Sequence, residues 1–361
     1  MRVLSLCETA MGGVGIYQNY LGGLAHEGRH LHFLVPAQHS SLIDPDLDVV
    51  TFQRRRRGLV ALLHMLLRFQ QTRRRLAPDI YLFHSTFALL ALLLLRLSGD
   101  RSPAFYFPHG WAVSNFAEGG WKQRVVRVIE GRLSGLATCV VNVSTAECEL
   151  AQRLGYRGRM RVIENAVPDV ADRARLPEPI QPNTLQLLFV GRFDRQKGLD
   201  LLLQAFARAS RQRPDLRLNV IGEAVRGGHN PSQPPPNVQL VGWVDRAEID
   251  HWYRSADAIL VPSRWEGLPL VIPEALRNGT PVLCSRRSGM ERLVTPGATG
   301  DHFPLTVEAI ESLLLRLDRD ELRRMRPACR AAYEARFAMT RWRAEIDTLL
   351  SEDGPAKALA A

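Results

Sequence analysis

Short runs of apolar residues alternate with longer stretches of helical spacing along the first half of the chain. Helical spacing is clear at residues 16–25, which follow a glycine-rich turn. Strands that alternate with helices predict a parallel, doubly wound sheet with right-handed crossovers. The runs that predict buried strands are 3–7, 31–35, 80–83, 104–107 and 138–143.

The same pattern starts again after a segment that contains four prolines within residues 168–183. The prolines and the lack of large apolar side chains predict a linker over 171–183. Further strands are predicted at 186–190, 216–221, 238–241, 258–261 and 282–284, with a helix at 199–209. We therefore expect an N-terminal domain of residues 1–170, a second domain of 184–335 and a C-terminal helix in 336–361 that crosses back to the first. In such folds the ligand is expected in a cleft between the domains, at the carboxyl ends of the strands.

No segment of the sequence predicts a membrane span. The most apolar run, 87–97, is well short of the ~20 residues that a spanning helix needs, and Arg96 interrupts it. A buried helix is the better interpretation. The first residues lack the basic and apolar regions of a signal peptide, so a cytoplasmic location is expected.

The composition is that of a globular protein with an unusual charge. Of 361 residues 46% are hydrophobic and 23% charged, which excludes a disordered or fibrous chain. Five cysteines without a C-x-x-C pair argue against a zinc ribbon or a disulfide scaffold. The net charge of +10 comes mostly from arginine, because only Lys122, Lys197 and Lys357 are lysines. Such a charge suggests nucleic acid, an anionic membrane or a phosphorylated small molecule as partner.

The excess of positive charge is concentrated in residues 1–170. Arginines at 54–57 and 73–75 lie on either side of the apolar stretch 59–69. A basic amphipathic helix of this kind can lie on an anionic bilayer. The alternative is a solvated surface helix, and the sequence leaves both open.

The first candidate for phosphate chemistry is the turn that contains Gly12, Gly13 and Gly15. Glycines between a strand and a helix let the backbone approach a phosphate, which the helix N-terminus then binds through its N–H groups. The turn lacks the full G-x-G-x-x-G fingerprint. A simple tight turn therefore explains it as well as phosphate binding does.

The second candidate is the loop 191–198, which follows the first strand of the second half. Arg192 and Lys197 lie near its two ends. Two cations at the end of a strand can bind a diphosphate and stabilise it as it leaves. A surface charge pair is the alternative interpretation.

The third candidate, 262–276, places Glu266 on a loop and Glu274 in the first turn of a helix, with Pro273 as the first helical residue. The N–H groups of Leu270 and Val271 are expected to face an anion, and the carboxylates to accept hydrogen bonds from sugar hydroxyls. A glycosidase acid/base pair would need a raised pKa, for which the sequence gives no reason. The plain alternative for Glu274 is charge complementarity with the helix.

The fourth candidate is His109, in the sequence His109-Gly110-Trp111, just after the predicted strand 104–107. A histidine at the carboxyl end of a strand is expected to face the ligand. A histidine satisfied within its own loop is the alternative.

Together these motifs resemble the retaining nucleotide-sugar glycosyltransferases of family 4, which have the GT-B fold of two Rossmann-like domains that face a cleft. The resemblance extends over nearly the whole chain, through GGVG, HG, VSTAECELAQRLGY, VIENAV, GRFDRQKG, VIGE, VQLVGWV and PSRWEG…PEALRNGTPV. The sequence departs from the family pattern at Leu268-Pro269, where a bulky aromatic residue and a glycine are usual, and at Gly222-Glu223-Ala224. These departures affect the identity of the sugar and of the base.

The resemblance implies a role for each matched residue. Glu266 would bind donor-sugar hydroxyls and Glu274 the ribose hydroxyls. Arg192 and Lys197 would neutralise the diphosphate, and His109 would stabilise the transition state at the anomeric carbon. Backbone N–H groups would also bind the diphosphate, and the Gly222 loop with the strand end at Val244 would surround the base. The diphosphate-binding N–H groups would be those of Gly13, Gly15, Leu270 and Val271.

The resemblance also implies the reaction. A sugar would pass from a nucleoside diphosphate, with UDP favoured over GDP, to a hydroxyl of a glycan or lipid-linked acceptor in exopolysaccharide, capsule or lipopolysaccharide synthesis. No metal or cofactor is expected; the D-x-D matches at Asp44/Asp46 and Asp318/Asp320 lie away from the other motifs. Two rivals remain, a nucleotide-sugar epimerase of the same fold and a basic protein that binds nucleic acid. The latter lacks a recognisable binding motif.

Overall fold

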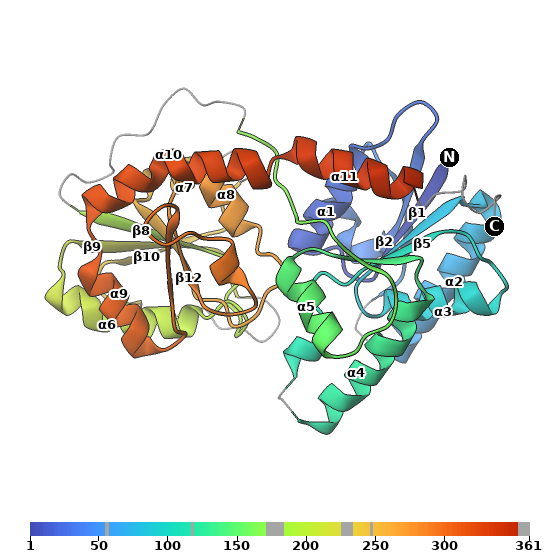
Figure 1. Ribbon diagram of the computed structural model, residues 1–361, viewed down its shortest axis with the longest axis horizontal. Coiled ribbons are helices and arrows are strands. Elements are labelled where there is room, and N and C mark those ends of the chain that lie inside the picture. The colour runs from blue at the N-terminus through green and yellow to red at the C-terminus, as the bar shows by residue number, and fades with distance from the viewer. Residues whose placement is uncertain (55–57, 117–118, 171–183, 225–233, 246–247, 353–361) are drawn as a thin grey trace. The chain divides into compact units, whose positions relative to one another are not determined.

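The computed structural model describes residues 1–54, 58–116, 119–170, 184–224, 234–245 and 248–352 (Figure 1). The chain divides into two compact units. Unit 1 comprises Met1–Glu164 and Trp342–Ala361, and unit 2 comprises Asn165–Arg341. The boundary therefore follows residue 164, whereas the sequence analysis ended the first domain at 170. The predicted linker 171–183 lies outside the described residues.

Unit 1 is built on a sheet of seven parallel strands in the order β3-β2-β1-β4-β5-β6-β7. The order reverses between β1 and β4, as it does in a doubly wound sheet, and the predicted architecture is confirmed. The strands are nearly continuous apolar runs, because helices cover both faces of a parallel sheet. Their bounds are β1 Arg2–Cys7, β2 His30–Pro36, β3 Asp48–Phe52, β4 Ile80–His84, β5 Ala104–Phe107, β6 Cys139–Asn142 and β7 Met160–Val162.

Helices pack on this sheet through their apolar faces. The strongly apolar helix α3 (Ala88–Leu97) buries Leu89, Leu92 and Leu95 completely, as expected of a buried helix. It contacts α2 (Leu59–Leu76) on one side and α4 (Trp121–Leu133) on the other. The remaining α-helices of the unit are α1 Gly13–Gly22, α5 Thr145–Arg153 and α11 Met339–Glu352, of which residues from Trp342 onward belong to unit 1.

Unit 2 repeats the architecture with six parallel strands in the order β10-β9-β8-β11-β12-β13. Its apolar core includes Leu187, Phe206 and Leu260. The strands are β8 Leu185–Val190, β9 Leu216–Ile221, β10 Val238–Gly242, β11 Ala258–Val261, β12 Val282–Ser285 and β13 Gly300–Phe303. The helices are α6 Leu199–Gln212, α7 Ile249–Ser255, α8 Val271–Arg277, α9 Val307–Arg316 and α10 Arg319–Arg336.

Three strands were missed by the apolar pattern, and all three are edge strands. They are β3 and β7 in unit 1 and β13 in unit 2. Edge strands bury less of their surface and so keep polar residues, as in Asp48 of β3 or Asp301 and His302 of β13. None of the described helices is both long and apolar enough to span a membrane.

Candidate functional site

The centre of the candidate site in unit 2 is an ion pair between Lys197 and Glu266. The Lys197 Nζ lies 2.7 Å from Glu266 Oε1, with side-chain exposures of 16% and 8%. Lys197 belongs to the loop after β8, and Glu266 belongs to the loop after β11. Because β8 and β11 are neighbours in the parallel sheet, both loops emerge at the carboxyl edge, where α/β sheets bind ligands.

Gln196 joins the other predicted cation to this pair. Its amide nitrogen donates to Glu266 Oε2 at 3.3 Å and to the Trp265 carbonyl at 3.0 Å, while its oxygen accepts from Arg192 at 3.1 Å. Arg192 also pairs with Asp194 at 3.1 Å. The structure thus brings Arg192, Lys197 and Glu266 together. Gln196 was not among the predicted site residues, although it lies beside Lys197 in the same loop.

Close backbone contacts between glycines and neighbouring carbonyls support these loops. A Cβ at Gly222 would lie 2.0 Å from the Gly191 oxygen, and a Cβ at Gly198 would lie 2.0 Å from the Pro262 oxygen. Both glycines have positive φ, +129° and +70°. Only glycine fits such positions, so the loops after β8, β9 and β11 meet backbone to backbone.

The predicted base-binding residues lie at the ends of β9 and β10. The Gly222 N–H donates to the Gly242 carbonyl at 2.9 Å, which joins the Gly222 loop to the strand end before Val244. Val244 is half-buried and follows the exposed Trp243. These two loops are therefore adjacent in unit 2.

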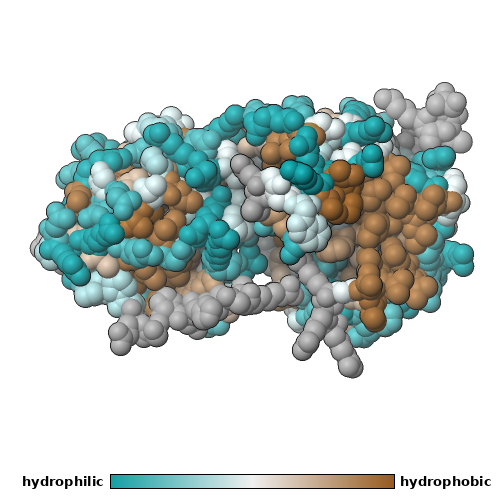
Figure 2. Space-filling model, turned by 90° about the horizontal axis from the view of Figure 1, so that it is seen from below, coloured by the Kyte–Doolittle hydropathy of each residue, from teal (hydrophilic) through white to brown (hydrophobic). Residues whose placement is uncertain are grey.

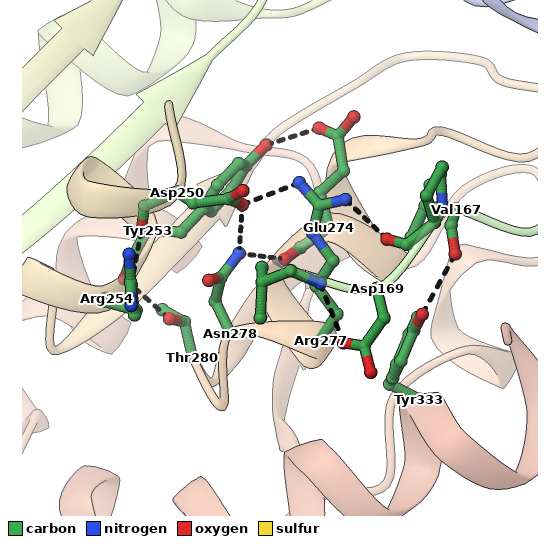
Figure 3. Close-up of polar contacts among 12 residues, drawn as sticks. Val167, Asp169, Asp250, Tyr253, Arg254, Glu274, Arg277, Asn278, Thr280 and Tyr333 are labelled. Atoms are coloured by element: carbon green, nitrogen blue, oxygen red, sulfur yellow. Dashed lines mark hydrogen bonds and ion pairs between the residues drawn. The ribbon is translucent and has the colours of Figure 1, made fainter. Parts of the chain in front are cut away.

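Glu274 lies in the first turn of α8 and is oriented by a buried tyrosine (Figure 3). The Tyr253 hydroxyl donates to Glu274 Oε2 at 2.8 Å. Burial, together with the neighbouring Glu274, raises the pKa of Tyr253 well above its usual range, so the phenol remains a donor. α8 begins at Val271 with Leu270 as its N-cap, so Pro273 is the third helical residue and not the first. The first-turn amides of Val271 and Ile272 therefore precede the carboxylate.

A network of ion pairs anchors the other end of α8 (Figure 3). Asp250 of α7 accepts from Arg277 at 2.6 Å and from Asn278 at 2.7 Å. Arg277 also donates to the Pro168 carbonyl at 2.7 Å. Because α7, α8 and the segment around residue 168 are joined in this way, Glu274 is carried on a rigid support.

In unit 1, the predicted His109 forms a pair with a second histidine. His84, the last residue of β4, places its Nδ1 2.9 Å from His109 Nε2, and the two rings stack at 5.2 Å. Burial lowers the pKa of His109 to about 3 and that of His84 well below its usual value, so both rings are neutral at pH 7. His109 has φ +53°, a strained backbone for a non-glycine residue. His84 was not among the predicted site residues, and its only signal in the sequence is its place at the end of a predicted strand.

Two buried glutamates hold the backbone that follows His109. Glu147 accepts from the Gly110 N–H and from the Val143 N–H. Glu130 accepts from the N–H groups of Ala112 at 3.0 Å and Val113 at 3.2 Å. Burial raises the pKa of Glu147 to about 7, while the two backbone donors oppose the shift. His109 is therefore not a free loop histidine but part of a supported turn.

In the glycine turn of unit 1, Gly15 is required by backbone packing, whereas Gly13 is exposed at the start of α1. A Cβ at Gly15 would lie 2.6 Å from the Ala10 oxygen, so Gly15 is required by the close approach of its own turn. Gly13 is exposed and begins α1, where N–H groups lack intrahelical acceptors. Buried Arg54 holds the preceding residues through a 3.1 Å ion pair with Glu8 and a bond to Thr9. The structure thus removes Arg54 from the predicted membrane cluster; residues 55–57 lie outside the described part.

Comparison with known proteins agrees with these observations. Residues 12–166 match the family described as glycosyl transferase 4-like domain, and residues 171–333 match glycosyl transferases group 1. The chain therefore belongs to the glycosyltransferases, with a C-terminal unit of group 1. No group of three or more His, Cys, Asp or Glu side chains in the described ranges is arranged to hold a metal ion.

Similar proteins occur in bacteria. An uncharacterised 41.2 kDa protein in the cps region of Klebsiella pneumoniae is 29% identical over 83% of this chain and 85% of its own length. A D-inositol 3-phosphate glycosyltransferase from Pseudarthrobacter chlorophenolicus is 31% identical over 67% of this chain, and the match spans 63% of that protein.

Solved structures share the architecture. Sucrose-phosphate synthase from Thermosynechococcus elongatus has a TM-score of 0.81 at 21% identity, over 97% of this chain and 98% of that one. HepE from Anabaena in complex with UDP and glucose has a TM-score of 0.80 at 18% identity, over 98% and 100%. Both likenesses establish the two-unit α/β architecture of the GT-B fold.

Proposed function

We propose that the protein is a retaining glycosyltransferase of family 4 that moves a hexose from a nucleoside diphosphate, preferably UDP, to a hydroxyl of a glycan or glycolipid. The observation that carries this proposal is the cluster of Arg192, Gln196, Lys197 and Glu266 at the carboxyl edge of the sheet in unit 2. Cations and a sugar-binding carboxylate held together in this way suit the two ends of a sugar diphosphate.

Each residue has a proposed role in that reaction. Lys197 and Arg192 neutralise the charge that develops on the leaving diphosphate, which is where electrostatic stabilisation lowers the barrier most. Glu266 binds hydroxyls of the donor sugar and Glu274 binds the ribose. The backbone N–H groups of Gly13, Gly15, Leu270 and Val271 contribute further donors to the diphosphate, and the Gly222 and Val244 loops receive the base.

His109 completes the proposal as a neutral group. With its Nε2 bonded to His84, its Nδ1 is the ring atom left to face the anomeric carbon. A neutral ring supplies a hydrogen bond without a fixed charge. The leaving phosphate oxygen accepts the proton of the acceptor hydroxyl, and the reaction needs no metal or cofactor.

The proposed biological setting is a bacterial surface polysaccharide. Support comes from the similar protein in a cps region and from the fold shared with the lipopolysaccharide outer core galactosyltransferase WaaB and with HepE bound to UDP-glucose. We place the enzyme in the cytoplasm, with peripheral contact to the inner face of the membrane.

The donor half of the proposal is tested by thermal shift with UDP, GDP and ADP, because a ligand that binds only the folded state raises Tm. We expect UDP to raise Tm most. Lys197→Met, which leaves the loop backbone intact, should abolish the UDP shift or weaken it strongly. Glu266→Gln should leave the shift with UDP in place and weaken the additional shift that a UDP-sugar gives over UDP. Indifference of the wild type to all three nucleotides would contradict the proposal.

The reaction itself is tested by NMR of a UDP-sugar with and without an acceptor glycan. A new glycosidic signal with the donor's anomeric configuration, only when acceptor is present, is expected. A new free or nucleotide-bound sugar without acceptor would indicate the epimerase instead. The nucleic-acid alternative predicts binding to duplex DNA that falls steeply with salt.

A further inference from the structure

Helix α2 turns an apolar ridge away from the core. Met65 and Phe69 are buried beneath it, whereas Val60, Leu63 and Leu67 are 71%, 58% and 59% exposed. Their spacing of three and four residues places them on one face of the helix. Isolated exposed apolar residues are ordinary, but a continuous ridge marks an interaction surface.

Helix α4 carries a second ridge of the same kind. Trp121 is 71% exposed, Val125 48% and Val128 49%, again with helical spacing, and Ile129 is 42% exposed beside them. Helix α3 contacts both α2 and α4 and ends in Leu97, which is 76% exposed. Figure 2 shows hydrophobic residues gathered over the side of unit 1 that holds these helices.

The exposed charged side chains of the three helices themselves are all basic. Across α2, α3 and α4 the only carboxylate is Glu130, which is fully buried. In the described part of the chain no carboxylate pairs with Arg74, Arg75, Arg124 or Arg132. The basic side chains of the three helices are Arg68, Arg73, Arg74, Arg75, Arg96, Lys122, Arg124, Arg127 and Arg132.

This charge pattern is not general to unit 1. Helix α11 of the same unit exposes Asp347 and Glu352 and pairs them with Arg29 and Arg161. A surface covered by chance arginines would be expected to show such compensation. On α2, α3 and α4 only the half-buried Arg73 has such a partner, Asp100, whereas the exposed Arg74, Arg75, Arg124 and Arg132 have none in the described ranges, which argues for an anionic partner.

An apolar pocket opens at the end of α2 nearest the carboxyl edge of the sheet. It encloses about 330 Å³ between Phe52, Leu62, Met65 and Phe87, beside exposed Leu59, and the buried Glu8–Arg54 ion pair forms part of its lining. The apolar surface thus continues inward at the edge where α/β units bind their ligands. A flat protein partner would leave such a pocket empty, whereas a hydrocarbon chain fits it.

We infer that the outer face of α2, α3 and α4, defined by the ridge residues above, docks on an anionic lipid bilayer. Apolar ridges would insert at the level of the headgroups while the flanking arginines bind lipid phosphates. A second copy of this chain is disfavoured as the occupant, because two such basic faces repel each other. Docking also favours an acceptor that is itself a membrane lipid, a conclusion that rests on the proposed function.

The test is co-sedimentation of the full chain with vesicles of phosphatidylcholine, with and without phosphatidylglycerol. We expect binding only when phosphatidylglycerol is present, and weaker binding as salt rises. Each basic side chain near such a surface contributes about fivefold. Arg124→Glu with Arg132→Glu should therefore reduce binding by more than about twentyfold, and Leu63→Gln with Val128→Gln should also abolish it.

Matched control variants lie elsewhere on the surface. Arg211→Glu on α6 removes an exposed arginine, and Leu42→Gln removes an apolar side chain that is 50% exposed. Both should bind vesicles as the wild type does. All variants should keep the wild-type Tm, which shows that they fold, and the wild-type thermal shift with UDP, which separates a failure of docking from a failure of the proposed function.

Three results would overturn the inference. They are equal binding to vesicles with and without phosphatidylglycerol, unchanged binding by the helix-face variants, and a concentration-dependent dimer that the Leu63→Gln and Val128→Gln pair dissolves in the absence of lipid. Equal binding would show that lipid charge does not drive docking. Unchanged binding by the variants would show that the face of α2, α3 and α4 is not the docking surface. A dimer of this kind would identify a second copy of the chain as the occupant.

Discussion

The amine of Lys197 lies 2.7 Å from the carboxylate of Glu266, and both side chains are largely buried although their loops are 69 residues apart. Burial makes such a pair sensitive to the loss of one member, because the remaining charge has lost its partner. When a diphosphate binds, the same amine can contact it while it still holds the carboxylate against the sugar. The pair therefore couples the two halves of the donor.

Lys197→Met removes the cation and keeps the side-chain volume. We expect kcat to fall by about 10²–10³, as for other groups that stabilise a leaving anion. The control is Arg208→Met, which breaks the exposed pair with Glu308 between α6 and α9. That pair should contribute little to stability and little to kcat. An equal loss of kcat in both variants would contradict the role of Lys197.

His84→Phe keeps the aromatic packing on Phe107 and His109 but removes the hydrogen bond to His109 Nε2. We expect kcat to fall about tenfold or more, because the ring of His109 loses its fixed orientation. The KM for the donor should change little, since His84 itself contacts no substrate in the proposal. His84→Asn retains a polar group near the position of Nδ1 and should recover part of the activity. Equal activity of the two variants would mean that His84 serves packing only.

Gly198→Ala tests whether the loops after β8 and β11 meet backbone to backbone. The new Cβ would clash with the Pro262 carbonyl at 2.0 Å, so we expect unit 2 to lose more than about 2 kcal/mol in chemical denaturation. Gly297→Ala has nearly the same φ, +74°, and nothing within 4 Å of the added Cβ. It should cost only the conformational penalty of about 1 kcal/mol. Similar costs at both positions would argue against the close contact.

Glu147 predicts a pH dependence of stability in unit 1. Its pKa is raised by burial to about 7, so between about pH 4.5 and 7 the native state binds more protons at this site than the unfolded state does. The stability that this gives is present below pH 4.5 and is lost as the pH rises through 7, by up to roughly 3 kcal/mol. Urea unfolding at pH 5 and pH 8 measures the loss. Glu147→Gln should show a smaller loss between the two pH values; an unchanged loss would assign it to another group.

The sequence predicted the order of the elements better than the details of the site. Buried strands such as β5 and β9 were predicted at their observed bounds, because a short, continuous apolar run between turns indicates a buried strand. The edge strands β3, β7 and β13 were missed because their residues are of mixed polarity. Such strands are defined by the neighbour they pair with, which a local pattern does not contain.

The same limit applies to the site. Arg192, Lys197 and Glu266 could be named from their loops and the family resemblance, and they do lie together in unit 2. Gln196 and His84, in contrast, matter only through contacts with residues distant in the sequence. Arg54 was taken for a surface charge because its neighbours are arginines, yet it is buried against Glu8. Burial of one member of a charged run is decided by tertiary packing.

The scarcity of lysine gives the molecule built-in chemical reporters. Lys122 lies exposed on α4 in the proposed bilayer-docking face, and Lys197 lies in the candidate donor site. With Lys357 and the N-terminal amine, they are the only primary amines of the chain. Acylation followed by peptide mass spectrometry should therefore show anionic vesicles protecting Lys122 and UDP protecting Lys197. One natural chain, without any substitution, would report separately on the two proposed ligands.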